Sequence, residues 1–323
     1  MLTTYDKAGQ GLVKRSPGTP AGPESIWFDL VDPTPEEDTL VETSLGISVP
    51  TRAEMRQVEA SNRFYIENGA CYMTAFVLSD IEAPVPEGSA VTFILTGPKL
   101  VTVRYANPKA FQQFQQLAEK GAATCSGGAE ILVGLMETHI ERLADLIERM
   151  QDEVDSLAAN IFASRKDQKS KSRRLDVILA GVGREGDISA RAQESAASLD
   201  RVLHFLEHNG RNGLCGTGVL ERIDVAQRDV TSLREHMRFL TDRIQFLLDA
   251  TLGMITTEQN QIIKLFSVMA VMLMPPTLVA SVYGMNFDSI HEFKWEHGYW
   301  WALSLMVVSA VIPFIYFKRK GWL

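Results

Sequence analysis

The chain has 323 residues, of which 46% are hydrophobic and 22% are charged, a balance typical of a folded protein rather than a disordered or fibrous one. Its 40 acidic and 32 basic residues give a formal net charge of -8, and no segregated basic face is evident, which argues against a nucleic-acid partner. The cysteines at 71, 125 and 215 are far apart and odd in number, so we expect no disulfide framework and a reducing compartment.

Residues 1–120 are predicted to form a cytoplasmic α/β domain. No apolar run follows the basic residues of the first thirty positions, so we expect no cleavable secretory signal. Asn68-Gly69 is a strong hairpin signal. The expected elements are strands at 26–30, 63–67, 70–78, 91–95 and 100–105, and helices at 33–45 and 108–120. The domain has no histidine, and Cys71 is expected in the core, so no catalytic constellation is predicted.

Residues 121–260 are predicted to form a cytoplasmic helical stalk. One heptad seam consists of Met136, Ile140, Leu143, Ile147, Met150, Val154, Leu157 and Ile161, and a second of Val230, Leu233, Met237, Leu240, Ile244 and Leu247. Residues 218–284 could form one helix of ~100 Å. Such a helix must pack on the helix at 128–164 or on copies of itself, so we expect oligomerisation. Residues 165–186 are expected to be a solvated turn region, with a second break at 208–218.

Two short motifs in the stalk match known sites by letter only. Residues 181–186 fit the Gly-x-Gly-x-x-Gly dinucleotide fingerprint, but their flanks are helical in character and no second parallel strand follows. His204 and His208 fit an inverted zinc-protease pattern, yet no third ligand is evident and the helix is expected to end directly afterwards, at Asn209-Gly210. We therefore discount both sites.

Two uncharged runs of 19 residues each, 265–283 and 299–317, are long enough to cross a bilayer core of ~30 Å at about 1.5 Å per residue. The predicted segments are a first transmembrane helix at 261–287, an external loop at 288–298, a second transmembrane helix at 299–317 and a basic tail at 318–323. Lys318, Arg319 and Lys320 follow the second span, so the positive-inside rule predicts a multi-pass membrane protein with both termini in the cytoplasm.

The first span carries a stripe of small and polar residues. Asn260, Ser267, Met274 and Ser281 recur every seven residues. Thr277 lies on the same face, Ile263 and Val271 are its apolar members, and Asp249 would extend it toward the cytoplasm. Such a stripe is typical either of tight helix packing or of a pore lining. The polar ends of the stripe, Asn260 and Gly284-Met285-Asn286, favour the pore.

Residues 274–287, Met-Pro-Pro-Thr-Leu-Val-Ala-Ser-Val-Tyr-Gly-Met-Asn-Phe, resemble the first-span signature of the CorA magnesium transporters, and residues 317–323 resemble their C-terminus. The resemblance implies a funnel-shaped homopentameric channel, lipid-embedded and not an enzyme, that takes up hydrated Mg²⁺ across the cell inner membrane. Mg²⁺ would then be both the transported and the regulatory ion. It also implies that Gly284, Met285 and Asn286 form the selectivity filter, with Gly284 and Asn286 contacting metal.

The resemblance further implies a pore lined by Asn260, Ile263, Ser267, Met274, Thr277 and Ser281, with Phe266 near the gate. The family is gated by intracellular Mg²⁺ held by cytoplasmic carboxylates, for which Asp224 and Asp249 are candidates here. His291 departs from the family, which commonly has proline there, and imidazole near the mouth could admit divalent cations such as Co²⁺, Ni²⁺ or Zn²⁺. The alternatives are a zinc transporter of the same superfamily and a membrane-anchored coiled-coil scaffold.

Overall fold

A computed structural model describes residues 1–15, 22–57, 59, 63–162, 171–211, 215–285 and 295–322. The chain divides into two compact units, one made of residues 1–164 and 178–248 and the other of residues 165–177 and 249–323. The first unit contains the sheet and most of the long helices, and the second contains both candidate membrane spans.

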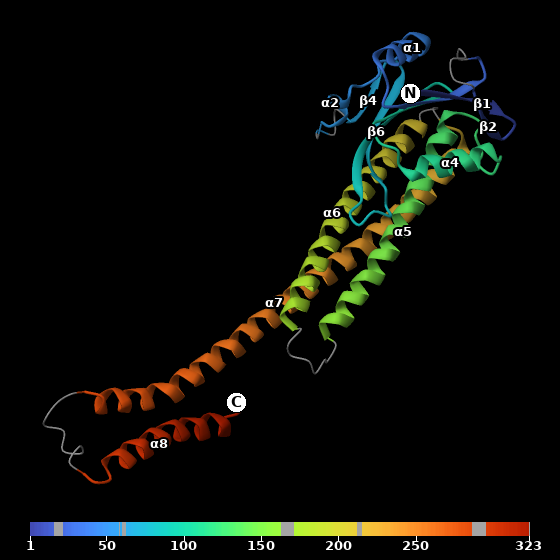
Figure 1. The fold of residues 1–323 in the computed structure, drawn as a ribbon. Coiled ribbons are helices and arrows are strands. Elements are labelled where there is room, and N and C mark those ends of the chain that lie inside the picture. Colours follow the sequence, from blue (N-terminus) through green and yellow to red (C-terminus); the bar gives the residue numbers. More distant parts are fainter. Residues whose placement is uncertain are drawn as a thin grey trace. The chain divides into compact units, whose positions relative to one another are not determined.

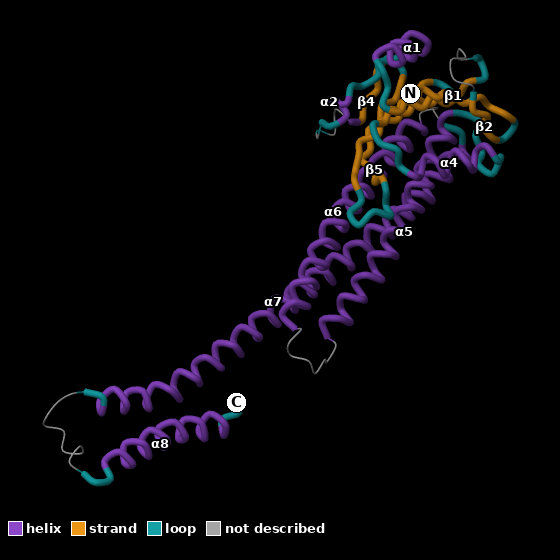
Figure 2. The backbone as a smooth tube through the Cα atoms, in the orientation of Figure 1, coloured by secondary structure: helices purple, strands orange, loops and turns teal. Residues whose placement is uncertain are grey.

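The described strands form a mixed seven-stranded sheet in the order β2-β1-β3-β7-β6-β5-β4 (Figures 1 and 2). They are β1 (Leu2–Ala8), β2 (Gly11–Lys14), β3 (Ser25–Val31), β4 (Phe64–Glu67), β5 (Ala70–Ser79), β6 (Glu87–Thr96) and β7 (Lys99–Arg104). Neighbouring strands run antiparallel except for β3 and β7, which are parallel. The predicted hairpin at Asn68-Gly69 is confirmed, with both residues at positive φ. The pair β1 and β2 was not anticipated from the sequence.

The described helices are α1 (Pro35–Leu45), α2 (Arg52–Met55), α4 (Lys109–Glu119), α5 (Gly128–Phe162), α6 (Lys171–Asn209), α7 (Thr217–Tyr283) and α8 (Gly298–Arg319). Capping boxes start α1 and α2, because Thr34 and Thr51 each exchange hydrogen bonds with the glutamate three residues later. Gly46 ends α1 at φ 66°, a conformation that glycine adopts without strain. Local sequence therefore explains where these short helices begin and end.

Successive side chains along each strand point to opposite faces of the sheet, and both faces are covered by helices. On one face, Phe28 and Leu30 of β3 pack with Val41 of α1 and Met55 of α2. On the other face, the ring of Phe93 in β6 stacks on that of Phe111 in α4, with centroids 6.3 Å apart. The sheet thus lies between α1 and α2 on one side and α4 and α5 on the other (Figure 1).

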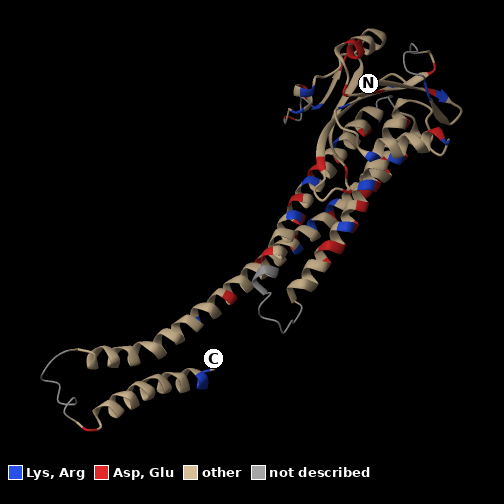
Figure 3. Cartoon of the chain, in the orientation of Figure 1, with Lys and Arg blue, Asp and Glu red and all other residues tan. Residues whose placement is uncertain are grey.

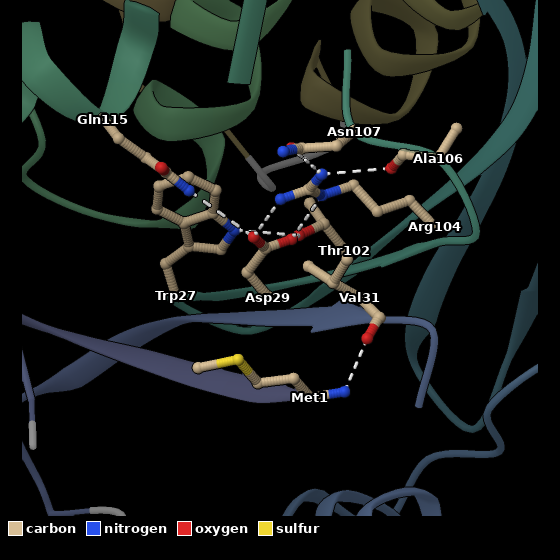
Figure 4. Close-up of polar contacts among 9 residues, drawn as sticks. All are labelled: Met1, Trp27, Asp29, Val31, Thr102, Arg104, Ala106, Asn107 and Gln115. Carbon is tan, nitrogen blue, oxygen red and sulfur yellow. Dashed lines mark hydrogen bonds and ion pairs between the residues drawn. The ribbon is translucent and has the colours of Figure 1, made fainter. Parts of the chain in front are cut away.

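A charged pair lies inside this second layer (Figure 4). The side chains of Asp29 and Arg104 are 2% and 4% exposed, and Arg104 Nη2 lies 2.7 Å from Asp29 Oδ2. Thr102 Oγ1 donates to Asp29 Oδ1 at 2.7 Å and accepts from the Trp27 indole at 3.0 Å. Gln115 Nε2 approaches the same carboxylate at 3.5 Å. The pair joins β3 to β7 across 75 residues of sequence.

The long helices α5, α6 and the first part of α7 pack together in the first unit. Every residue of the predicted α5 seam is buried, and in the α7 seam only Leu233 is half-exposed. Ion pairs flank these seams at Glu137–Arg222, Glu153–Arg184, Asp155–Arg243 and Asp200–Arg234. The second seam is therefore buried within one chain, so the seams alone do not require a second copy.

The expectation of a solvated turn at 165–186 is wrong from residue 171 onward, where α6 is continuous; residues 163–170 lie outside the described part of the chain. A Cβ at Gly181 would lie 2.9 Å from Leu157 Cδ2, so glycine here allows α6 to approach α5 closely. Val182, the next residue, is 1% exposed. Tertiary packing overrides the low helix propensity of these glycines. The fingerprint-like residues 181–186 thus lie inside a helix, which excludes the strand-turn-helix of a dinucleotide site.

Candidate ion-conducting site

The site is built on α8 and on the part of α7 that lies in the second unit, from residue 249 onward. The predicted single helix at 218–284 is confirmed by the 67 residues of α7, whose last part is long and apolar enough to cross a membrane. The 22 residues of α8 meet the same test. Figure 3 shows Lys, Arg, Asp and Glu throughout the sheet domain and the stalk helices. By contrast, the last part of α7 and most of α8 carry almost no charged residues until the end of α8. Apolar side chains exposed along both helices need lipid or another protein surface to cover them.

The stripe predicted to line a pore lies on an uncovered face of α7. Ile263 and Met274 are 60% and 70% exposed. All six stripe residues are exposed in the single chain: Asn260, Ile263, Ser267, Met274, Thr277 and Ser281. At 100° per residue they fall on one side of the helix, and the better-covered residues fall on the other: Val268, Met272, Pro275, Pro276, Val279 and Tyr283. The stripe is thus free to face an axis or a partner while the opposite side is partly covered.

The hydroxyl of Thr277 is oriented by its own helix. Thr277 Oγ1 donates to the Leu273 carbonyl at 2.7 Å, a common arrangement for threonine in helices. Because its proton is engaged, this oxygen has only acceptor lone pairs left for an outside group. A hydroxyl in this state suits a cation or the water molecules that a cation carries.

The proposed filter begins where α7 ends. The Gly284 amide donates to the Ala280 carbonyl at 2.9 Å, and the Met285 amide donates to the Val282 carbonyl at 3.3 Å, so helix-like bonding continues just past Tyr283. A Cβ on Gly284 would lie 3.0 Å from the Ala280 carbonyl, tighter than usual for a side chain. Met285 is 46% exposed. The third filter residue, Asn286, lies outside the described residues.

The two candidate regulatory carboxylates, Asp224 and Asp249, are both exposed on α7, the first in the first unit and the second in the second unit. Within the described part of the chain, no three His, Cys, Asp or Glu side chains gather closely enough to hold a metal ion. His204, singled out by the zinc-protease pattern, instead lies 3.3 Å from Asp200 on the surface of α6.

A basic cluster marks one end of the two spans. Lys318 and Arg319 occupy the last turn of α8. The ammonium groups of Lys264 and Lys320 lie 5.9 Å and 5.3 Å from the centre of the Trp322 ring, so the start of the first span and the end of the second meet there. The partnership of Lys264 with Trp322 was missed from the sequence, since 58 residues separate them and no local pattern links them.

Comparison with known proteins identifies the family. A family profile described as "CorA-like Mg2+ transporter protein" matches residues 23–319. The chain belongs to the CorA-like Mg²⁺ transporter family. The magnesium transport protein CorA of Pectobacterium atrosepticum is 35% identical over 299 residues, covering 93% of this chain and 92% of that protein. The CorA of Salmonella typhimurium is 35% identical over 300 residues, with the same coverage of both chains.

The fold of this CorA-family chain is shared with a solved structure. The CorA magnesium transporter of Methanocaldococcus jannaschii superposes with a TM-score of 0.76 at 18% identity and covers 100% of this chain and 99% of that one. The predicted arrangement of an α/β domain, a long helix and two C-terminal candidate membrane helices is thereby confirmed. The CorA family consists of transporters, which agrees with the absence of a catalytic motif in the sequence.

Proposed function

We propose that this chain assembles as a homopentamer and conducts Mg²⁺ into the cell through a pore lined by α7. The observation that carries the proposal is the exposed stripe of α7, which combines hydroxyls, an amide and two large apolar side chains on the face opposite the better-covered one. Several copies arranged around an axis would enclose that stripe. Curated relatives that match over 93% of the chain are named magnesium transport proteins, which supports Mg²⁺ as the ion.

The stripe suits a hydrated cation. Mg²⁺ holds six waters and releases them reluctantly, so a pore can select it through oxygen acceptors that contact its hydration shell. The side-chain oxygen of Thr277 is such an acceptor, and the Gly284 carbonyl and the Asn286 amide would add rings of oxygen at the outer mouth. Ile263 and Met274 would form apolar constrictions that close by excluding water.

Regulation and topology are parts of the same proposal. Intracellular Mg²⁺ would gate the pore by binding carboxylates from neighbouring copies, with Asp224 and Asp249 as candidates. The basic cluster at the ends of the spans supports a cytoplasmic position for that side, since Lys and Arg accumulate on the cytoplasmic face. Both termini would then be cytoplasmic, with the protein in the inner membrane. In this proposal the cytoplasmic part consists of the α/β domain at 1–120 and the helical stalk at 121–260. The membrane part consists of the first transmembrane helix at 261–287, the external loop at 288–298, the second transmembrane helix at 299–317 and the basic tail at 318–323.

Zinc transport is the rival within the superfamily. It has less support, because the curated relatives at about this level of identity are named for magnesium. Passage of Co²⁺ or Ni²⁺ as minor ions is compatible with the proposal, since His291 and His297 offer imidazole ligands. A scaffold without transport could use the stripe for helix packing, but its polar ends, Asn260 and Gly284-Met285-Asn286, would then have no role.

The decisive experiment is Asn286→Ala in a bacterial strain that lacks its own magnesium transporters. We expect Mg²⁺ uptake to fall to background because the ring of amides at the mouth is lost. Native mass spectrometry of the purified variant should still show five copies. Gln261→Ala is the matched control, since it removes an amide from α7 on the side away from the stripe and should leave uptake unchanged.

Uptake at the unmodified level in Asn286→Ala would reject the filter. Unmodified protein that appears only as monomers or dimers would reject the pentamer. A zinc flux above the magnesium flux at physiological ratios of the two ions would move the chain to the zinc branch.

A further inference from the structure

A cavity of about 500 Å³ lies in the first unit, between α2, α6 and the end of the β5–β6 hairpin at which the two strands are joined. Three guanidinium groups line it, those of Arg52, Arg56 and Arg63. Its volume is in the range of small-molecule sites, ~300–1,000 Å³. The whole lining belongs to one unit, so the cavity is a property of a single chain.

These three arginines differ from most others in the unit. Arg104, Arg184, Arg222, Arg234 and Arg243 each form an ion pair with a carboxylate. By contrast, none of the three cavity arginines pairs with a carboxylate among the described residues.

The contacts that the cavity arginines do make leave much of their charge available. The Arg52 guanidinium lies 5.2 Å from the centre of the Tyr105 ring, and Arg63 Nε donates to the Gln57 carbonyl at 2.5 Å. Most of the donors on these three guanidiniums are therefore free to bind an anion. Planar guanidinium groups match phosphate oxygens in a two-pronged geometry.

The rest of the lining is not that of a bare phosphate site. Met55, Phe76 and Tyr105 supply apolar and aromatic surface, and Glu87 and Glu194 supply two carboxylates. An occupant should therefore carry an anionic group for the arginines, a flat apolar part for the rings, and hydroxyl or amino donors for the carboxylates. Nucleoside phosphates combine these three features, and an inorganic phosphate ion has only the first.

We propose that this cavity binds a nucleoside phosphate, with the phosphate groups on Arg52, Arg56 and Arg63. The cavity does not overlap the proposed pore, because all of its lining residues lie in the first unit.

The test is calorimetric titration of ADP into the detergent-solubilised full chain in magnesium-free buffer. We expect saturable binding of one ADP per chain, and the double variant Arg52→Gln/Arg56→Gln should bind at least about tenfold more weakly because two charge-assisted contacts are lost. Both side chains are exposed, so the variant should fold and unfold at the same temperature as the parent. Lys14→Gln is the matched control, since it removes an exposed positive charge from β2 at the opposite edge of the sheet.

Several outcomes would overturn the site. One is the absence of saturable ADP binding up to about 1 mM, and another is an unchanged affinity in the double arginine variant. An equal loss of affinity in Lys14→Gln would show general attraction by positive charge rather than a site. Pyrophosphate binding as tightly as ADP would show that the apolar and acidic parts of the cavity do not contribute to ligand affinity.

Discussion

Replacing Asp29 with alanine should destabilise the sheet domain severely. The change removes the acceptor for Thr102 Oγ1 at 2.7 Å and for Arg104 Nε and Nη2 at 3.0 Å and 2.7 Å. Arg104, whose side chain is only 4% exposed, would then keep a buried charge without its carboxylate. Removing one partner of a buried ion pair costs about 3–5 kcal/mol.

The assay is thermal unfolding of the detergent-solubilised chain, followed by circular dichroism. At about 2–4 °C per kcal/mol for a domain of this size, a loss of about 4 kcal/mol lowers the unfolding temperature by about 8–16 °C. Asp145→Ala is the matched control, because Asp145 is 61% exposed and 3.4 Å from Arg142. Exposed pairs contribute less than about 1 kcal/mol, so its unfolding temperature should shift by no more than a few degrees.

The double variant Asp29→Leu/Arg104→Met separates the charge from the packing. Replacing both partners by apolar side chains of similar size leaves no unpaired charge, so the double variant should be more stable than Asp29→Ala alone. The Asn107 amide, which loses Arg104 as a partner, is exposed and can bond to water. A shift of less than about 2 °C for Asp29→Ala, or a double variant less stable than the single one, would refute the reasoning.

Three further predictions concern protonation and the proposed external loop. His139 is buried, its Nδ1 pairs with the Leu135 carbonyl at 2.7 Å, and burial lowers its pKa to about 4. Since the unfolded chain takes up this proton near pH 6.5, stability should be complete above that pH and fall by about 2 kcal/mol toward pH 5. His139→Leu should flatten the unfolding temperature between pH 7 and pH 5, and an equally steep profile in that variant would assign the pH dependence to other groups. In the loop, Glu292→Gln should lower Mg²⁺ uptake modestly, and more at low ionic strength, because it weakens the attraction of cations to the mouth. Replacing His291 and His297 with Gln should spare Mg²⁺ uptake but reduce any Co²⁺, Ni²⁺ or Zn²⁺ entry, and loss of most Mg²⁺ transport in that variant would contradict this view of the loop.

Features that depend on nearest neighbours along the chain were predictable. The uncharged runs at 265–283 and 299–317, the heptad seams and the Asn68-Gly69 turn predicted elements that the structure contains. The stripe proposed to line the pore follows from helical periodicity as well, and the structure adds that its residues lie exposed on the face opposite the better-covered one. The filter assignment rests on the family resemblance, and Asn286 lies outside the described residues.

Features that depend on distant contacts were not predictable. Residues 171–186 contain three glycines and a group of basic residues, and low helix propensity suggested a turn. The structure makes them helical because packing of Val182 in the core, and the close approach of Gly181 to Leu157, outweighs that propensity. The α7 seam likewise left open whether its partner was another helix of the same chain or another copy, and only the fold buries it within one chain.

The helical and apolar periods, the two candidate spans and the family could be recognised without a structure, because each depends on residues that are close together along the chain. The tertiary structure decided the strand order, the parallel pairing of β3 with β7 and the buried partnership of Asp29 with Arg104. It also brought the three cavity arginines, at 52, 56 and 63, together with the β5–β6 hairpin and with Glu194 of α6. The physical reason is that such contacts join segments whose separation in sequence carries no local signal, and they form only when burial of the sheet's two faces brings those segments together.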